Sequence, residues 1–145
     1  MKIVHPVFGE LTFNYGWTKS IKLNIFKKEF SVEINIDADE DEVFDENQIK
    51  AFEFFFSDIQ NRVTQAENSI VGYYNSIIDE VNAKDNPSEI FRFLTVKQIM
   101  IPMNFDDNTR EAGFICDCEW DIENGVGIKY INEQISEIGF QDIFL

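Results

Sequence analysis

Two cysteines and four carboxylates share one short stretch near the C-terminal end of the chain, Cys116-Asp117-Cys118-Glu119-Trp120-Asp121-Ile122-Glu123. Thiolates bind zinc, but a closed zinc site takes about four nitrogen or sulfur ligands, and His5 is the one further candidate in the sequence. Alternation along a strand places both thiols on the side of Phe114 and Trp120. We therefore expect Cys116 and Cys118 to be free core thiols, with no zinc site and no Cys–His nucleophile, and His5 to be an ordinary surface residue.

The same alternation would align the carboxylates along the opposite, solvated face of that strand, about 6 to 7 Å apart. They are Asp117, Glu119, Asp121 and Glu123. Such a row could serve acid–base or metal-assisted hydrolysis, hold a divalent cation, or meet Lys and Arg side chains of a partner. A row of solubilising charges is the alternative. Because no Gly-rich phosphate loop, Ser-His-Asp set or HExxH motif occurs, we expect no catalytic residue, no cofactor and no dedicated metal site.

A second acidic segment, Asp37-Ala38-Asp39-Glu40-Asp41, begins like an EF-hand loop, with carboxylates at its first, third and fifth positions. Position six is Glu42, where the sharp turn of such a loop needs Gly, and position twelve is Gln48, where a bidentate Glu should close the shell. This segment is therefore expected to be a solvated acidic loop that leads into a helix.

Composition limits the fold and the class of partner. A length of 145 residues suits one domain, and 44% hydrophobic residues with fifteen Phe argue against disorder. No apolar run is long enough to cross a bilayer or to form a signal peptide, which predicts a soluble, cytoplasmic protein. The net charge is −15: residues 1–36 have five Lys against three Glu, and the remainder has seven basic against twenty-four acidic residues. This charge disfavours nucleic acid and anionic membranes and favours a basic protein partner.

Hydrophobic periodicity predicts the elements that position these residues. Apolar alternation predicts a strand over residues 7–15 and a hairpin of strands at 21–25 and 30–36. Helical spacing follows from Ile49 to Val81, with Asp45 and Gln48 as an N-cap and capping box. This pattern is either one long helix or two helices that break near Asn68 or Gly72. Its spacing places Phe52, Phe55 and Phe56 in the core and leaves Phe54 exposed.

After a short helical turn opened by Pro87, alternation returns. It predicts strands at 99–103, 114–120, 126–130 and 135–140, with turns at 106–109 and 123–125 and with Pro102 at a sheet edge or a strand end. We therefore predict a single α+β domain over residues 1–145. A largely antiparallel sheet of about six or seven strands, in an N-terminal and a C-terminal meander, packs on the long helix or helix pair.

The chain resembles a bacterial family known only as a domain of unknown function, members of which are found in toxin–immunity gene neighbourhoods. The residues that carry the resemblance are Phe8-Gly9-Glu10-Leu11, Trp17, Gln48, Tyr73-Tyr74, Cys118-Glu-Trp120-Asp121-Ile-Glu123-Asn-Gly125-Val-Gly127-Ile128 and Ile138-Gly139. Related sequences often read Trp-Asp-x-Glu-His-Gly in the longest of these segments, whereas this chain has Asn124 at the position of that His. The family supplies no catalytic residues to transfer.

The leading hypothesis is a small acidic binding protein, plausible as an immunity protein that neutralises a basic toxin domain such as a nuclease. Candidate charged contacts are Asp117, Glu119, Asp121, Glu123, Asp39 and Asp41, and candidate aromatic anchors are Phe54, Trp17 and Tyr15. Two alternatives remain open. One is a divalent-metal-binding protein or metal-dependent hydrolase that uses the carboxylates of residues 117–123. The other is a structural module that oligomerises through Phe54 or a sheet edge near Pro102.

Overall fold

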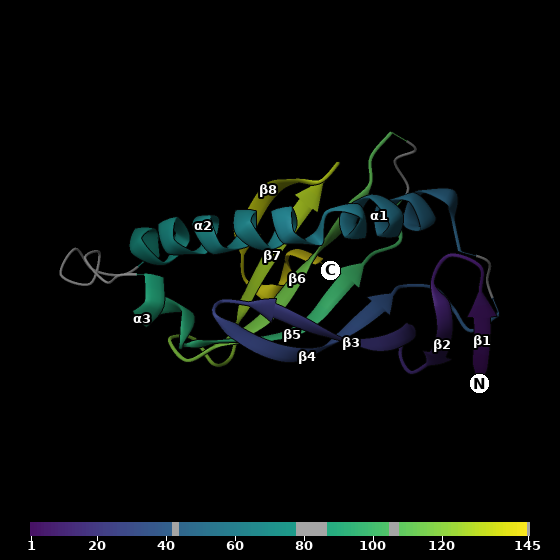
Figure 1. The fold of residues 1–145 in the computed structure, drawn as a ribbon, viewed down its shortest axis with the longest axis horizontal. Coiled ribbons are helices and arrows are strands. Elements are labelled where there is room, and N and C mark those ends of the chain that lie inside the picture. Colours follow the sequence, from purple (N-terminus) through teal and green to yellow (C-terminus); the bar gives the residue numbers. More distant parts are fainter. Residues whose placement is uncertain (42–43, 78–86, 105–107, 145) are drawn as a thin grey trace.

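A computed structural model describes residues 1–41, 44–77, 87–104 and 108–144. One eight-stranded sheet runs through the molecule, with its strands side by side in sequence order (Figure 1). The strands are β1 (Lys2–His5), β2 (Gly9–Phe13), β3 (Trp17–Ile25), β4 (Lys28–Ile36), β5 (Leu94–Ile101), β6 (Glu111–Cys118), β7 (Val126–Ile131) and β8 (Gln134–Gly139). Neighbouring strands are antiparallel except β4 and β5, which are parallel because the helices connect them. The predicted α+β class and largely antiparallel sheet are confirmed.

The sheet has eight strands, more than the six or seven that were predicted, because the N-terminus forms a hairpin of its own. Residues 7–15 were expected to be one strand, whereas the chain reverses at residues 6–8 between β1 and β2. His5 fixes this reversal, since its Nδ1 accepts hydrogen bonds from the backbone N–H groups of Val7 (3.0 Å) and Phe8 (3.3 Å). His5 is therefore a turn residue that stacks on Phe8, and not an ordinary surface side chain.

The helical region consists of two consecutive helices, α1 (Glu46–Ser57) and α2 (Ile59–Ile77). The predicted capping box is confirmed: Asp45 accepts from the backbone N–H of Gln48, and the Gln48 side chain accepts from the backbone N–H of Asp45. The expected break near Asn68 or Gly72 is wrong, because the helices part at Asp58. Positions 78–86, which include the predicted helical residue Val81, lie outside the described residues.

Asp58 separates the helices because its short side chain starts a new cap. Its backbone leaves the helical conformation, with φ −144° and ψ 67°, and its carboxylate accepts from the backbone N–H of Asn61 at 3.2 Å. On the other side of the break, the buried Arg62 donates from Nη2 to the carbonyl oxygen of Phe54 at 3.3 Å. A cation at the C-terminal end of α1 is favourable, because the last carbonyl groups of a helix lack partners within it.

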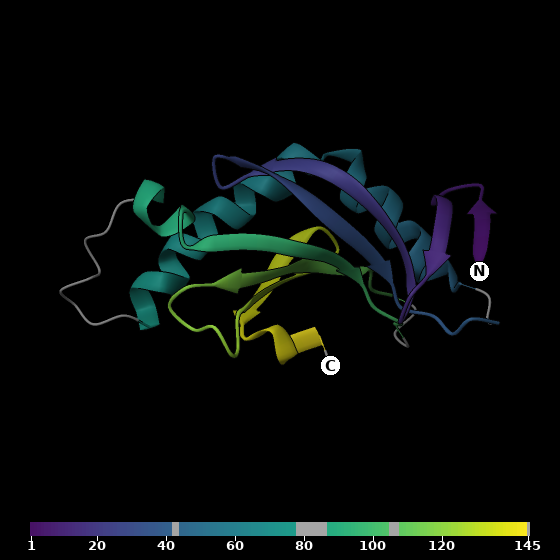
Figure 2. The same ribbon diagram turned by 90° about the horizontal axis from the view of Figure 1, so that it is seen from below.

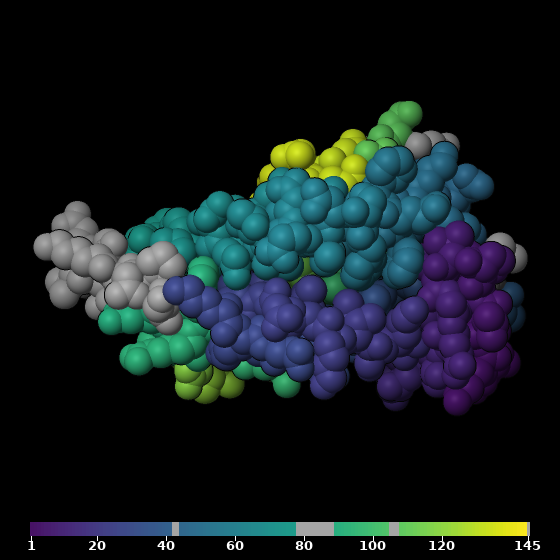
Figure 3. Space-filling model, in the orientation of Figure 1, coloured from purple at the N-terminus to yellow at the C-terminus, as the bar shows by residue number. Residues whose placement is uncertain are grey.

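The two helices cover one face of the sheet. The opposite face is uncovered except where the C-terminal segment of the chain folds over it (Figure 2). Together the helices present a continuous surface over the strands beneath them (Figure 3). The core lies between these two layers and contains Val32, Ile34, Phe55, Val63, Ile70, Ile99, Phe114, Cys116, Val126, Ile128 and Tyr130. None of the described helices is long and apolar enough to cross a membrane.

Gln48 ties three elements together at one end of the core. Its Nε2 donates to the carbonyl oxygen of Asp37 at 2.6 Å, and more weakly to that of Ile101 at 3.5 Å. Asp37 directly follows β4, and Ile101 is the last residue of β5. The buried Gln48 amide therefore joins the start of α1 to both parallel strands. β5 ends at Ile101, directly before Pro102, which marks the end of the strand. Because β5 lies between β4 and β6, Pro102 follows a central strand of the described sheet and not an edge strand.

Past β8, the last described turn, η2 (Gln141–Phe144), folds back across the uncovered face of the sheet (Figure 2). It packs against three glycines on adjacent strands, Gly113, Gly127 and Gly139. A Cβ at Gly127 would lie 3.0 Å from both Ile143 Cγ1 and the Phe140 carbonyl oxygen, so the absence of a side chain there allows the chain to approach closely. Side-chain-free positions therefore let η2 lie directly on the sheet.

Candidate functional site

The predicted row of four carboxylates on one strand is not formed. β6 ends at Cys118, and residues 119–125 form a turning segment that leads to β7. Gly125 adopts a φ of 59°, and the Asp121 carboxylate accepts from the backbone N–H of Asn124 at 3.2 Å, which closes the turn locally. Asp117 alone lies on the strand, whereas Glu119, Asp121 and Glu123 follow the turn. The prediction that the strand continues to Trp120 was wrong, because side-chain hydrogen bonds within the turn take the place of hydrogen bonds between strands there.

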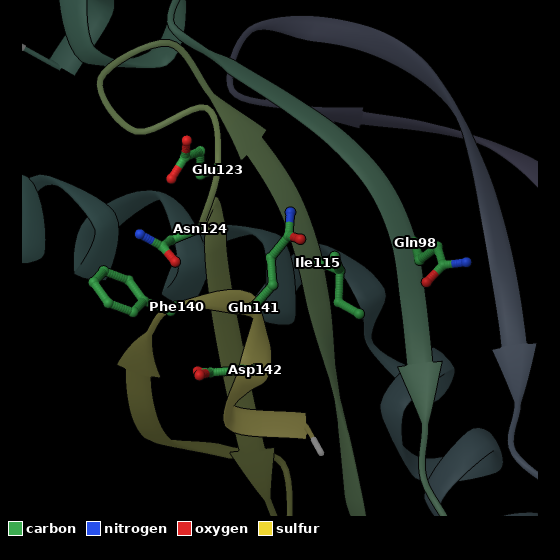
Figure 4. A pocket seen from close by; sticks show the side chains of 7 residues that line it. All are labelled: Gln98, Ile115, Glu123, Asn124, Phe140, Gln141 and Asp142. Carbon is green, nitrogen blue, oxygen red and sulfur yellow. The ribbon is translucent and has the colours of Figure 1, made fainter.

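The turn nevertheless gathers the acidic side chains around two depressions at the end of β6. One depression has a volume of about 370 Å³ and is lined by Gln98, Ile115, Glu123, Asn124, Phe140, Gln141 and Asp142 (Figure 4). A smaller one, of about 230 Å³, is lined by Phe93, Thr95, Asp117, Cys118, Glu119 and Ile122. The Asp117 carboxylate connects them, since it lines the smaller depression and accepts from Gln141 Nε2 of the larger one at 3.1 Å.

Two exposed apolar side chains accompany these charges. Ile122 is 83% exposed at the tip of the turn, and Phe140 is 45% exposed directly before η2. We name the group Asp117, Glu119, Ile122, Glu123, Phe140 and Asp142 the acidic loop surface. Ile122, Phe140 and Asp142 were not among the candidate residues predicted from the sequence. The available signal was an apolar Ile in the middle of a polar turn sequence; Phe140 and Asp142 are brought there only by the return of η2.

The cysteines occupy the core as predicted. Cys116 and Cys118 are free and buried on the helix-facing side of β6. Burial, with a smaller contribution from neighbouring negative charge, raises the pKa of both thiols. Trp120 packs partly buried against Tyr74, with ring centroids 5.0 Å apart. The thiols are therefore protonated at neutral pH and poorly suited to nucleophilic or metal-binding chemistry.

The predicted aromatic anchors differ in their availability. Trp17 is only 2% exposed, and its indole N–H donates to the Asp39 carbonyl oxygen at 3.2 Å, so it is a core residue and cannot anchor a partner. Phe54 is half exposed as predicted, but the Arg110 guanidinium lies 4.5 Å from its ring centroid and is held there by Glu133. Tyr15 is 95% exposed in the turn between β2 and β3, and β4 and β5 separate these two strands from β6 and β7.

The second acidic segment, residues 37–41, is fixed to the sheet through its backbone. The Asp37 N–H donates to the Ile101 carbonyl oxygen at 3.0 Å, and the carbonyl groups of Asp37 and Asp39 accept from Gln48 and Trp17. The side chains of Asp39 and Asp41 are exposed. The backbone carbonyls of Asp37 and Asp39 thus serve the fold, and residues 42–43, the next positions of the EF-hand-like pattern, lie outside the described residues.

Within the described ranges, no three His, Cys, Asp or Glu side chains come together in a group that could hold a metal ion. The geometry of residues 117–123 therefore lends no support to the metal-dependent alternative. The Lys97 ammonium lies 3.8 Å from the Asp117 carboxylate. Exposed pairs of this kind contribute about 0–1 kcal/mol, so Lys97 does not commit Asp117 to a structural role.

A family model with the description "Domain of unknown function (DUF6985)" matches residues 7–145. The chain belongs to this family. The predicted resemblance to a domain of unknown function is therefore confirmed. The description of DUF6985 says nothing about toxin–immunity loci. No curated protein and no solved structure matches the chain. The DUF6985 match spans both the helical layer and the acidic loop surface.

Proposed function

We propose that this protein binds a basic protein partner through the acidic loop surface, and that it acts as an immunity protein for a basic toxin domain such as a nuclease. The observation that carries the proposal is the combination of clustered charge with exposed apolar groups. Ile122, 83% exposed on the turn, lines the smaller depression together with Asp117 of β6 and Glu119, and Glu123 follows it directly in the chain. Single exposed apolar residues are ordinary on protein surfaces, but an apolar side chain beside like charges suits an interface with an opposite charge.

The charges and the apolar groups would act on different steps of binding. A net charge of −15 steers a basic partner toward the protein, and the carboxylates of the turn orient the encounter. Ile122 and Phe140 would supply the desolvated contacts that slow dissociation. Tight protein interfaces bury roughly 800 Å² on each partner, so neighbouring surface must also take part.

The rigid mounting of the turn supports this assignment. The Glu119 N–H donates to the Phe93 carbonyl oxygen at 3.0 Å at one end of the turn, and Gln141 and Asn124 are joined through their backbones at 3.0 Å at the other. A pre-ordered loop loses less conformational entropy on binding than a loose one. The acidic loop surface can therefore meet a partner without a rearrangement of the turn that bears it.

Co-expression with the product of the adjacent gene tests the proposal. The expected result is a complex that survives purification and, where that product is toxic, restored growth. The double variant Glu119→Lys and Glu123→Lys should slow association and weaken its salt dependence, whereas the control Glu53→Lys, at a residue of α1 that is also exposed, should have little effect. Absence of binding and of rescue by the wild-type protein would refute the proposed function.

A further inference from the structure

The larger depression beside the acidic loop surface has an unusual hydrogen-bonding character. Three amide side chains line it, Gln98, Asn124 and Gln141. Each amide donates its NH₂ group into the protein: Gln98 to the Glu33 carboxylate at 2.8 Å, Asn124 to the Asp121 carboxylate at 3.0 and 3.2 Å, and Gln141 to the Cys116 carbonyl oxygen at 2.7 Å. Because every one of these partners is an acceptor, the orientation of each amide is fixed by chemistry.

The carbonyl oxygens of the three amides therefore remain available to accept hydrogen bonds from a ligand. The carboxylates of Glu123 and Asp142 add further acceptors, both on exposed residues. None of the seven described lining residues is Lys or Arg. A depression whose amide NH₂ groups each donate to an internal acceptor, and whose carboxylates only accept, is matched to a ligand that donates.

The apolar part of the lining specifies the shape of that ligand. Ile115 lies on β6 at the centre of the depression, and the Phe140 ring stands on the opposite side from Gln98 (Figure 4). An aliphatic floor accommodates methylene groups, and an aromatic face attracts a cation that lies over it. The volume of about 370 Å³ is sufficient for one long side chain.

We propose that this depression receives an arginine side chain of the basic partner. The guanidinium group has five N–H donors, no acceptor, and a flat surface that stacks on aromatic rings, whereas a lysine ammonium is a compact, strongly hydrated charge with three donors. Phe140 would stack on the guanidinium, Glu123, Asp142 and the amide oxygens would accept from it, and Ile115 would contact its methylene groups. This inference rests on the proposed function, because it assigns the depression to a side chain of the proposed partner.

The direct test uses two short peptides, one alternating Gly with Arg and one alternating Gly with Lys, titrated into the whole protein by calorimetry. We expect the Arg peptide to bind roughly two- to fivefold more tightly, the range for one exposed cation–aromatic contact. Glu123→Gln, Asp142→Asn and Phe140→Leu should each weaken the Arg peptide by roughly two- to fivefold. Glu53→Gln, which removes the same charge from α1 on the other layer, should not.

Circular dichroism melts of the variants would establish that each is folded. Equal affinity for the two peptides, absence of Arg peptide binding, or an equal loss in Glu53→Gln would overturn the inference, since diffuse charge would then explain any binding. If the adjacent gene product binds wild type and the three pocket variants equally, the arginine assignment is wrong and the proposed function stands. If the peptides behave as expected and the gene product does not bind, the proposed function is wrong and the preference for guanidinium stands.

Discussion

The packing of η2 on the sheet can be tested at one atom, by the change Gly113→Ala. A Cβ at this position would overlap the backbone carbonyl oxygen of Ile128 on β7 and the Cζ atom of Phe144 on η2. The Phe144 ring can move, but the Ile128 carbonyl belongs to a strand paired on both sides, with β6 and β8. Relief therefore requires that the β6–β7 ladder itself shift.

The expected cost follows from two opposing contributions. Replacing Gly by Ala within a strand stabilises the folded state by about 0.5–1 kcal/mol, because the unfolded chain then has less conformational entropy to lose. Overpacking typically costs about 1–3 kcal/mol, and more where backbone must move. We expect a net loss of about 2 kcal/mol in the free energy of unfolding, which corresponds to roughly 4–8 °C in Tm for a chain of this size.

Urea denaturation with Gly72→Ala as the matched control would measure this difference. Gly72 lies in α2, and a Cβ there would meet no atom within 4 Å. The control should therefore gain about 0.5–1 kcal/mol, because Ala favours the helix. If Gly113→Ala unfolds at the wild-type urea concentration with an unchanged slope, η2 and β7 do not pack as described, and the geometry of the larger depression must be reconsidered.

Three further outcomes follow from buried groups. Gln48→Met should lower the free energy of unfolding by about 1–3 kcal/mol in urea titrations, because the Asp45 N–H and the Asp37 carbonyl lose their partner; wild-type stability would contradict this role. Cys116 and Cys118 should react with a thiol reagent only after denaturation, since both are buried and burial raises their pKa; rapid labelling of the native protein would disprove it. Burial also raises the pKa of Tyr130 from 10.0. Above about pH 10 the unfolded state therefore releases a proton that the folded state retains, and stability should fall as pH rises, less steeply in Tyr130→Phe. If the stability of the variant falls with pH as steeply as that of the wild-type protein, Tyr130 is not the source of the pH dependence.

Local patterns in the sequence were sufficient where the structure depends on neighbouring residues. Alternation identified the hairpin of β3 and β4 and the strands of the C-terminal meander, because one face of each is buried. The capping box of Asp45 and Gln48 spans three residues and could be recognised directly. The same reasoning placed Cys116 and Cys118 in the core, since period two fixes which face a residue joins.

The reasoning failed where a local hydrogen bond ended an element earlier than its hydrophobic pattern. Asp58 divides the helices although the apolar stripe continues past it, and Asp121 closes a turn where alternation suggested more strand. Phe26 and Glu133 adopt positive φ values of 54° and 65° in tight turns, which residues of these types rarely do. Contacts from distant positions accompany them: Glu67 accepts from the Phe26 N–H, and Arg110 pairs with Glu133.

Sequence alone therefore determined the class of fold, the sign of the charge and the inward orientation of the cysteines, because these depend on composition and period. It also located the segment of interest, residues 117–123. Only the tertiary structure decided what that segment presents. The return of η2 over Gly113, Gly127 and Gly139 brings Phe140, Gln141 and Asp142 beside Glu123. No spacing along the chain encodes that meeting, since it arises from packing between elements that lie far apart until the sheet has formed.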